Sequence, residues 1–280
     1  MTEEPIELFK GHEPNPSKHR FPDLSYLAEE LDLNGYFVVP DRLTPSQLDE
    51  LRTEIDRLLE VEEREFGEEN LRRINDCGVV RSPFLSSQGV RDACFDSLVF
   101  DALDLVFGKQ RVLHVNRAVV NDPSQKHPAA VWHREPAYVD FTASRPLSLT
   151  CIQMIDPSND MNGGIEMLVG SHRWPRFPSD EFVRRNAVVP SIPAGSLLVF
   201  NSLLFHRNTA NQTNDLRRSL VTIFTTPVIK QQVNIPQMMR DRQCESIADQ
   251  LPDGRFLFGF DTELRQNDDD YRRSKLHQIK

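Results

Sequence analysis

The sequence lacks the features that would place it in a membrane or nucleic-acid-binding class. None of its apolar runs approaches the roughly 20 consecutive residues that span a bilayer, so we expect no membrane partner. Its 33 Lys and Arg residues are outnumbered by 42 Asp and Glu residues, for a formal net charge of −9. Because binding to a phosphate backbone needs a basic surplus, we also expect no nucleic-acid partner.

Cysteine is scarce as well. The four cysteines (Cys77, Cys94, Cys151 and Cys244) form no C-x-x-C pair, and four thiols in 280 residues do not make a disulfide framework. The first ten residues are acidic and lack the basic-then-apolar order of a signal peptide. We therefore expect a cytoplasmic location, where thiols stay reduced.

Common catalytic signatures are missing too. The sequence contains no G-x-S-x-G elbow, no Walker A loop, no H-E-x-x-H motif and no strand-linked G-x-G-x-x-G motif. The pair Gly163-Gly164 predicts a tight turn between strands. Any chemistry must therefore come from a constellation of residues that are distant in the sequence.

The predicted helices precede the predicted strands. Thr44, Pro45 and Gln47 form a capping box with proline at the first helical position, and a second amphipathic helix is expected over 92–107. After Gly108, short β-branched or aromatic runs alternate with turn residues. The expected strands are 112–120, 147–155, 164–169, 188–192, 196–201 and 220–227. This order predicts a mainly β fold with flanking α-helices, built around an antiparallel sandwich or barrel.

The domain organisation follows from composition. Residues 1–22 carry several prolines among polar residues and are predicted to form an extended arm. Residues 23–253 are expected to form a single domain, and 254–280 a polar C-terminal tail. We find no internal repeat. We expect a monomer or a homodimer.

One histidine pattern suggests a metal site. Trp132-His133-Arg134-Glu135 is expected to open a strand, so His133 and Glu135 would point to the same face and reach one cation together. His206 follows another predicted strand. Two imidazoles and one carboxylate form the facial triad of non-haem Fe(II) oxygenases. An H-x-E pair by itself fits an exposed pair at a strand edge better than a metal site, and that alternative stays open at this point.

A basic residue follows the last of these candidates. Arg217 lies eleven residues after His206 and begins a segment with the alternation of a strand. A guanidinium on a core strand near a metal is suited to bind a carboxylate through two hydrogen bonds. It would hold the far end of a dicarboxylic cosubstrate.

Five segments in order resemble the phytanoyl-CoA dioxygenase-like (PhyH) family of Fe(II)/2-oxoglutarate-dependent oxygenases. They are Asn34 to Pro40, Trp132 to Glu135, Met161 to His172, Pro193 to Phe200, and the series His206, Asn211, Arg217. The resemblance covers about residues 33 to 227. It implies a double-stranded β-helix, or jelly roll, with Fe(II), 2-oxoglutarate and O2 as cofactor and cosubstrates.

The resemblance also implies roles for individual residues. His133, Glu135 and His206 would be the iron ligands, and Arg217 would bind the distal carboxylate of 2-oxoglutarate. Two further residues are candidates for contacts with 2-oxoglutarate, namely Asn116 and Ser219. The expected reaction is hydroxylation of an unactivated C–H bond, with 2-oxoglutarate and O2 converted to succinate and CO2. Desaturation, ring closure and epimerisation share the same early steps.

Two positions depart from the family pattern. Glu135 stands where the family usually has aspartate, and Asn208 stands where many members carry serine. We interpret Glu135 as a working variant, because both histidines and Arg217 are present. A retained carboxylate also argues against a halogenase, in which a small residue replaces it.

The substrate is expected to be a small molecule. The residues predicted to line the mouth of the jelly roll are Arg134, Tyr138, Phe141, Arg173, Trp174 and Arg176. Arg173 and Arg176 beside Trp174 would suit a substrate that carries a carboxylate or phosphate and an apolar part.

Two alternatives belong to other functional classes. A non-catalytic jelly-roll binding protein with a degenerate metal site would be consistent with Glu135 and Asn208, whereas the intact Arg217 opposes it. A cupin-type metalloenzyme that does not use 2-oxoglutarate would have no need for Arg217.

Overall fold

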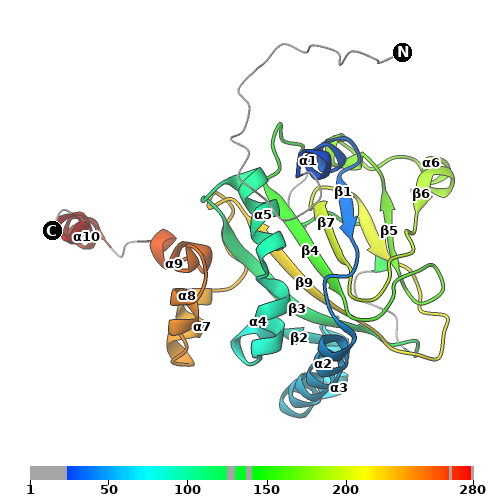
Figure 1. The fold of residues 1–280 in the computed structure, drawn as a ribbon, viewed down its shortest axis with the longest axis horizontal. Helices are drawn as coiled ribbons and strands as arrows, with labels where there is room; N and C mark the ends of the chain where they lie inside the picture. Colours follow the sequence, from blue (N-terminus) through cyan, green and yellow to red (C-terminus); the bar gives the residue numbers. More distant parts are fainter. Residues whose placement is uncertain (1–23, 125–129, 137–140, 265–266, 279–280) are drawn as a thin grey trace, which may run out of the picture.

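The computed structural model describes residues 24–124, 130–136, 141–264 and 267–278. Its centre is a six-stranded antiparallel sheet in the order β1-β7-β4-β9-β3-β2, which faces a three-stranded sheet in the order β6-β5-β8 (Figure 1). The strands are β1 (Tyr36–Val39), β2 (Val79–Arg81), β3 (Val112–Asn121), β4 (Ser148–Met154), β5 (Ile165–Leu168), β6 (Ala187–Val188), β7 (Leu197–Asn201), β8 (His206–Asn208) and β9 (Arg217–Thr225). The predicted jelly-roll core with flanking helices is therefore confirmed.

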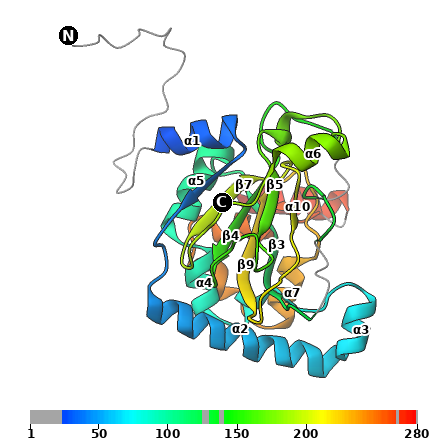
Figure 2. The ribbon, with the colours of Figure 1, turned by 90° about the vertical axis from the view of Figure 1, so that its right-hand side faces the viewer.

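The helices are unevenly distributed around this core. Figure 2 shows α4 and α5 on one side of the large sheet and β5 with α6 on the other. The α-helices are α1 (Leu24–Leu33), α2 (Pro45–Phe66), α3 (Glu68–Arg73), α4 (Gln88–Cys94), α5 (Ser97–Phe107), α6 (Asp180–Asn186), α7 (Ile235–Asp241), α8 (Ser246–Asp249), α9 (Gly254–Leu257) and α10 (Asp268–Gln278). Three short 3-10 helices complete the described elements: η1 (Pro83–Leu85), η3 (Ser171–Arg173) and η4 (Phe260–Thr262).

The two faces of the large sheet bury different clusters. Ala118 and Leu220 belong to the larger apolar core, which the helices share with the sheet. Val119 and Val221, one position further along the same strands, belong to a second core that includes residues of the small sheet. Because successive side chains of a strand point to opposite faces, parity along β3 and β9 decides which residues face the helices and which face the space between the sheets.

The first long helix begins as its sequence predicts. The Gln47 backbone N–H donates to Thr44 Oγ1 at 3.3 Å, and the Thr44 N–H donates to Gln47 Oε1 at 2.9 Å. Pro45 occupies the first helical position, where its missing N–H leaves no bond unmade. The capping box is thus confirmed.

The second predicted helix, over 92–107, is wrong as a single element. It divides into α4 and α5, because Asp96 adopts an extended conformation and its carboxylate accepts a hydrogen bond from the Val99 N–H at 3.0 Å. A side chain that caps a new helix in this way ends the preceding one. Because apolar residues recur with helical spacing on both sides of Asp96, the sequence pattern predicted one continuous helix.

The predicted start of the polar tail, residue 254, lies before the end of the folded core. Leu257 and Phe258 are fully or almost fully buried in the larger core, and Phe258 stacks on Phe84 with ring centroids 5.4 Å apart. The folded domain therefore extends beyond residue 253, and the boundary predicted there is wrong. The predicted arm, residues 1–22, lies outside the described residues.

Within the described part of the chain, none of the helices combines the length and the apolar character that crossing a membrane requires.

Candidate functional site

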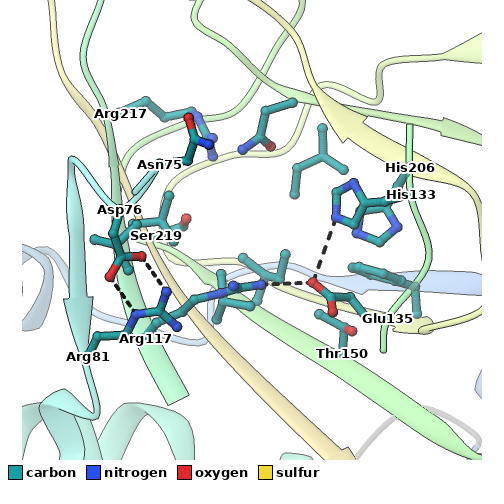
Figure 3. Close-up of a pocket in the computed structure, with 17 residues that line it drawn as sticks. Asn75, Asp76, Arg81, Arg117, His133, Glu135, Thr150, His206, Arg217 and Ser219 are labelled. Carbon is teal, nitrogen blue, oxygen red and sulfur yellow. Dashed lines mark hydrogen bonds and ion pairs between the residues drawn. The ribbon is translucent and has the colours of Figure 1, made fainter. Parts of the chain in front are cut away.

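A cavity between the two sheets brings together the main residues singled out by the sequence. Its walls include His133, Glu135, His206, Arg217 and Ser219 (Figure 3). It holds about 120 Å³ of free space, several times the roughly 30 Å³ that one water molecule occupies in the liquid. A small ligand therefore fits between the sheets.

The two histidines face each other across paired backbone segments. His133 and His206 exchange backbone hydrogen bonds of 3.0 and 3.1 Å, and their ring centroids lie 4.3 Å apart. His133 lies in an isolated bridge and not in a strand, so the predicted strand at this point is wrong. The pairing still places both imidazoles at one end of the cavity.

Each imidazole has one nitrogen committed to the backbone. His133 Nδ1 lies 2.8 Å from the Val131 carbonyl oxygen, and His206 Nδ1 lies 2.8 Å from the Leu204 carbonyl oxygen. A carbonyl only accepts, so each Nδ1 carries a proton, and in the neutral imidazole the lone pair is then on Nε2. Histidine ligands in metal sites are oriented by hydrogen bonds of this kind from the nitrogen that does not bind the metal.

His206 is held in the neutral form that a metal requires. Burial lowers its pKa to about 3, with smaller contributions from the nearby His133 and Arg117. An imidazole with such a pKa carries no proton on Nε2 near neutral pH. Its lone pair is then available without the release of a proton.

Glu135 supplies the carboxylate of the predicted triad. Its Oε1 lies 3.8 Å from His133 Nε2 and 3.0 Å from Arg117 Nη2. With the carboxylate directed to Arg117, the described residues contain no group of three His, Cys, Asp or Glu side chains that is already placed to hold a metal ion. The donor types do fit a divalent transition metal, since they are two imidazoles and one carboxylate.

Arg217 is the most deeply buried cation of the cavity. It is 1 % exposed at the start of β9, and among the described residues its Nε and Nη1 have no hydrogen-bond partner. Burial lowers its pKa to about 10, opposed by the charge of Asp156, so it remains a cation at pH 7. A buried guanidinium with unsatisfied N–H groups is costly, and these groups are available to donate to a carboxylate. Ser219 lines the cavity on the same strand.

Asn116 is wrong as a candidate for contact with 2-oxoglutarate. Its side chain points to the helical face, where Oδ1 accepts from the Phe84 N–H at 3.2 Å and Nδ2 donates to Thr222 Oγ1 at 3.0 Å. The next residue, Arg117, has the opposite parity and lines the cavity. Arg117 was not predicted as a site residue. The signal that could have identified it is a charged side chain inside the otherwise mostly apolar run of 112–120.

Arg134 is wrong as a substrate-binding residue. It is 6 % exposed, and its guanidinium donates to the carbonyl oxygens of Leu203 at 2.9 Å, Ser171 at 3.0 Å and Trp174. The guanidinium carbon also lies 3.8 Å from the ring centroid of Phe205. Because Arg134 alternates with its neighbours His133 and Glu135, it points away from the cavity and ties together the segments behind it.

The remaining predicted substrate residues do not line this cavity. Trp174 packs edge-on against Phe182 at 5.4 Å, and Arg173 forms a 2.9 Å ion pair with Asp32 beside a separate cleft. Two more of them are exposed, Phe141 and Arg176. The predicted substrate-binding role of Arg173 and Trp174 stays a prediction that the walls of this cavity do not support, and Tyr138 lies outside the described residues.

Comparison with known sequences identifies the family. The Phytanoyl-CoA dioxygenase (PhyH) family matches residues 31–219. The chain therefore belongs to this family, as its motifs predict, and falls in the class of Fe(II)- and 2-oxoglutarate-dependent oxygenases.

Individual proteins are similar to this chain in sequence or in fold. The uncharacterized protein Rv1501 of Mycobacterium tuberculosis is 26% identical over 254 residues, which cover 89% of this chain and 91% of that protein. The crystal structure of EctD from S. alaskensis with 2-oxoglutarate and 5-hydroxyectoine matches with a TM-score of 0.62 at 18% identity, covering 78% of this chain and 80% of that one. The non-heme alpha ketoglutarate dependent epimerase SnoN from nogalamycin biosynthesis matches with a TM-score of 0.55 at 18% identity, covering 73% and 83%. Both structures share the fold of this chain.

Proposed function

We propose that the protein hydroxylates a C–H bond of a small-molecule substrate, with His133, Glu135 and His206 holding Fe(II) and Arg217 binding 2-oxoglutarate. The observation that carries this proposal is the buried Arg217, whose Nε and Nη1 have no partner among the described residues, in the same cavity as two imidazoles with available Nε2 atoms. EctD and SnoN, which share the fold, are described with 2-oxoglutarate or alpha ketoglutarate.

Arg217 would bind the carboxylate of 2-oxoglutarate that lies away from the metal. Because this guanidinium is buried, it would pair with a carboxylate in a low-dielectric environment, where charge-assisted hydrogen bonds are strongest. Ser219, two positions along the same face of β9, presents a hydroxyl for a further hydrogen bond. Thr150 on β4 also lines the cavity, where its hydroxyl is hydrogen-bonded to that of Ser202 at 2.8 Å.

The reaction balances with one molecule each of substrate, 2-oxoglutarate and O2. Products are the hydroxylated substrate, succinate and CO2. The bound iron would supply the oxidising chemistry, and the chain's own residues orient the reactants and keep the site dry. Val119, Ile152, Phe200 and Val221 form the apolar walls that limit the access of water. Hydroxylation is the simplest outcome on this site, whereas SnoN, which shares the fold, is described as an epimerase.

An anaerobic titration tests the cosubstrate site. Fe(II) and 2-oxoglutarate are added to the wild type, to Arg217→Ala and to Glu135→Ala, and the weak visible charge-transfer band of the chelate is recorded. We expect the band in the wild type and a weaker one in Arg217→Ala. Arg218→Ala is the matched control, because Arg218 lies on the same strand and binds Asp56 at 2.7 Å and Asp156 at 3.0 Å.

The two alternatives make different predictions in this titration. Bound metal without a band would contradict the proposal and favour a cupin-type enzyme that does not use 2-oxoglutarate. Absence of metal binding would contradict it as well and favour a binding protein with a degenerate site. An unpartnered buried cation such as Arg217 is a costly feature for either alternative to keep.

A further inference from the structure

We propose that Arg117 is a positioning residue, which holds the Glu135 carboxylate toward the two histidines so that the three side chains bind a metal together. The inference rests on the proposed function of this cavity. The Arg117 Nη2 atom lies 3.0 Å from Glu135 Oε1, and Figure 3 shows the Arg117 guanidinium directed to this carboxylate. The same oxygen lies 3.8 Å from His133 Nε2.

Arg117 is anchored more firmly than the residue it holds. It lies within β3, whose backbone pairs with β2 on one side and β9 on the other, opposite Arg81 and Val221. Glu135 lies outside the strands, and its backbone N–H donates to the Ser202 carbonyl oxygen at 2.8 Å. A side chain from a central strand therefore provides a fixed point for a carboxylate on a less regular segment.

Glutamate needs such a fixed point more than aspartate does. Its additional methylene adds one rotatable bond, and ordering that bond on metal binding costs conformational entropy. A carboxylate already held by Arg117 loses less freedom when the metal arrives, which is preorganisation in the usual sense. The ion pair thus accompanies the replacement of the family's usual aspartate by Glu135.

Two effects of Arg117 on metal binding have opposite signs. Its positive charge repels a divalent ion and competes for the carboxylate, so this effect weakens binding. Its hydrogen bond fixes the carboxylate, which strengthens binding. A carboxylate has two oxygens and about four lone-pair sites, so it can accept from Arg117 and bind a metal at the same time. We infer that positioning outweighs repulsion.

Arg81 provides the matched control. It lies directly opposite Arg117 in the β2–β3 register and lines the same cavity. Its guanidinium is held by Asp76, with one hydrogen bond of 2.9 Å, and not by Glu135. Arg81→Ala therefore removes the same charge from the same cavity and leaves Glu135 in place.

The experiment measures the Kd for Mn(II) with the full-length protein, without O2 and without turnover, from the electron paramagnetic resonance signal of free Mn(II). We expect Arg117→Ala to raise this Kd by about 10- to 100-fold, the range found when the hydrogen-bond partners of metal ligands are removed. Arg81→Ala is expected to leave it unchanged or lower it. Arg117→Lys, which keeps the charge and one donor, is expected to recover part of the affinity.

A double-mutant cycle separates positioning from a general structural effect. In the Glu135→Asp background the side chain is shorter by one methylene, so we expect its carboxylate to lose the contact with Arg117 and Arg117→Ala to raise the Kd by a much smaller factor. Thermal denaturation of each variant checks that it is folded. If Arg117→Ala is not folded, Arg117→Lys replaces it in the cycle.

The failure of this inference can be told apart from failure of the proposed function. If the wild type binds Mn(II) and Arg117→Ala binds it equally or more tightly, the positioning role is wrong and the proposed site stands. If Arg117→Ala raises the Kd by the same factor in the wild type and in the Glu135→Asp background, the positioning role is also wrong. If the wild type does not bind Mn(II), the proposed metal site and this inference are both wrong.

Discussion

Arg217 on β9 pairs with Asn121 on β3, so its side chain lies on the same face of the sheet as Arg117, four residues earlier along β3. At about 3.3 Å per residue, this places the two positions roughly 13 Å apart along the sheet. One guanidinium contacts Glu135, and the other has two donors without a partner among the described residues. These two cations of the cavity therefore differ in their surroundings: Arg117 lies beside the candidate metal ligands, and Arg217 lies farther along the same face with N–H groups available for a carboxylate.

Replacing Arg217 by methionine should stabilise the protein in the absence of ligand. The guanidinium is buried, and its Nε and Nη1 are unpartnered in the described structure, so an apolar side chain of similar length removes a desolvation penalty. We expect a gain of about 1–3 kcal/mol in the free energy of unfolding, by analogy with buried charges replaced by apolar residues. Urea denaturation measures it.

The same variant should respond less to 2-oxoglutarate. In the presence of a divalent metal, 2-oxoglutarate is expected to raise the Tm of the wild type by more than that of Arg217→Met, because the variant has lost one of the groups that hold the cosubstrate. A variant less stable than the wild type, or one stabilised by 2-oxoglutarate as much as the wild type, would contradict the role given to Arg217.

Asn116 and Ser219 should respond in opposite ways to truncation. Asn116→Ala leaves the Phe84 N–H without its acceptor and should cost about 1–3 kcal/mol of stability, with 2-oxoglutarate affinity retained. Ser219→Ala should weaken 2-oxoglutarate binding by roughly 3- to 10-fold, the equivalent of one modest hydrogen bond, with little loss of stability. Calorimetric titration and urea denaturation of both variants check this. Weaker 2-oxoglutarate binding by Asn116→Ala alone would reverse our assignment.

Truncation of Arg134 should affect folding and not substrate selection. Its guanidinium bonds three carbonyl oxygens and covers the ring of Phe205, so Arg134→Ala should cost several kcal/mol, about 2–4. Arg173→Ala is the control, because its ion pair with Asp32 is solvent-exposed and should contribute less than about 1 kcal/mol. Equal urea midpoints for the two variants would show that Arg134 is not structural.

The stability of the protein should fall in mild acid, in part because of His172. Burial lowers the pKa of this imidazole, which is 6 % exposed in the fold, below its usual value near 6.5. The unfolded chain therefore takes up a proton at a higher pH than the folded chain does. Stability is then fully present above about pH 6.5 and declines as the pH falls below it, by at most about 1.4 kcal/mol per pH unit for one group.

His172→Asn tests this contribution. Urea denaturation at pH 7, 6 and 5 should give a shallower decline for the variant than for the wild type. A decline of equal slope in both proteins would show that His172 titrates alike in the folded and unfolded chains. Since burial lowers the pKa of His114 and His206 too, the variant is expected to keep part of the slope.

Local patterns in the sequence were sufficient for the elements and for much of the site. The capping box at Thr44 and Gln47 depends on neighbours three residues apart, and the strand-forming runs after Gly108 depend on alternation, so both could be predicted. The motifs around His133, His206 and Arg217 were local enough to predict that these residues meet in one cavity, where the structure places them.

The tertiary structure decided what depends on parity and on distant partners. A shift of one residue along β3 separates Asn116, which faces the helices, from Arg117, which faces Glu135. Arg134 is predicted at the mouth of the cavity and lies behind it, because its acceptors are carbonyl groups far away in the sequence. Phe258 lies in the predicted polar tail, and its assignment to the core depends on its contact with Phe84, which is distant in the sequence.

The sequence by itself therefore determined the family, the antiparallel core and the residue types of the site, because these depend on periodicity and motif order. The tertiary structure decided on which face of the sheet each side chain lies and which charged residues form ion pairs, because both depend on strand register and on contacts between segments distant in the chain. The ion pair between Arg117 and Glu135 belongs to the second kind.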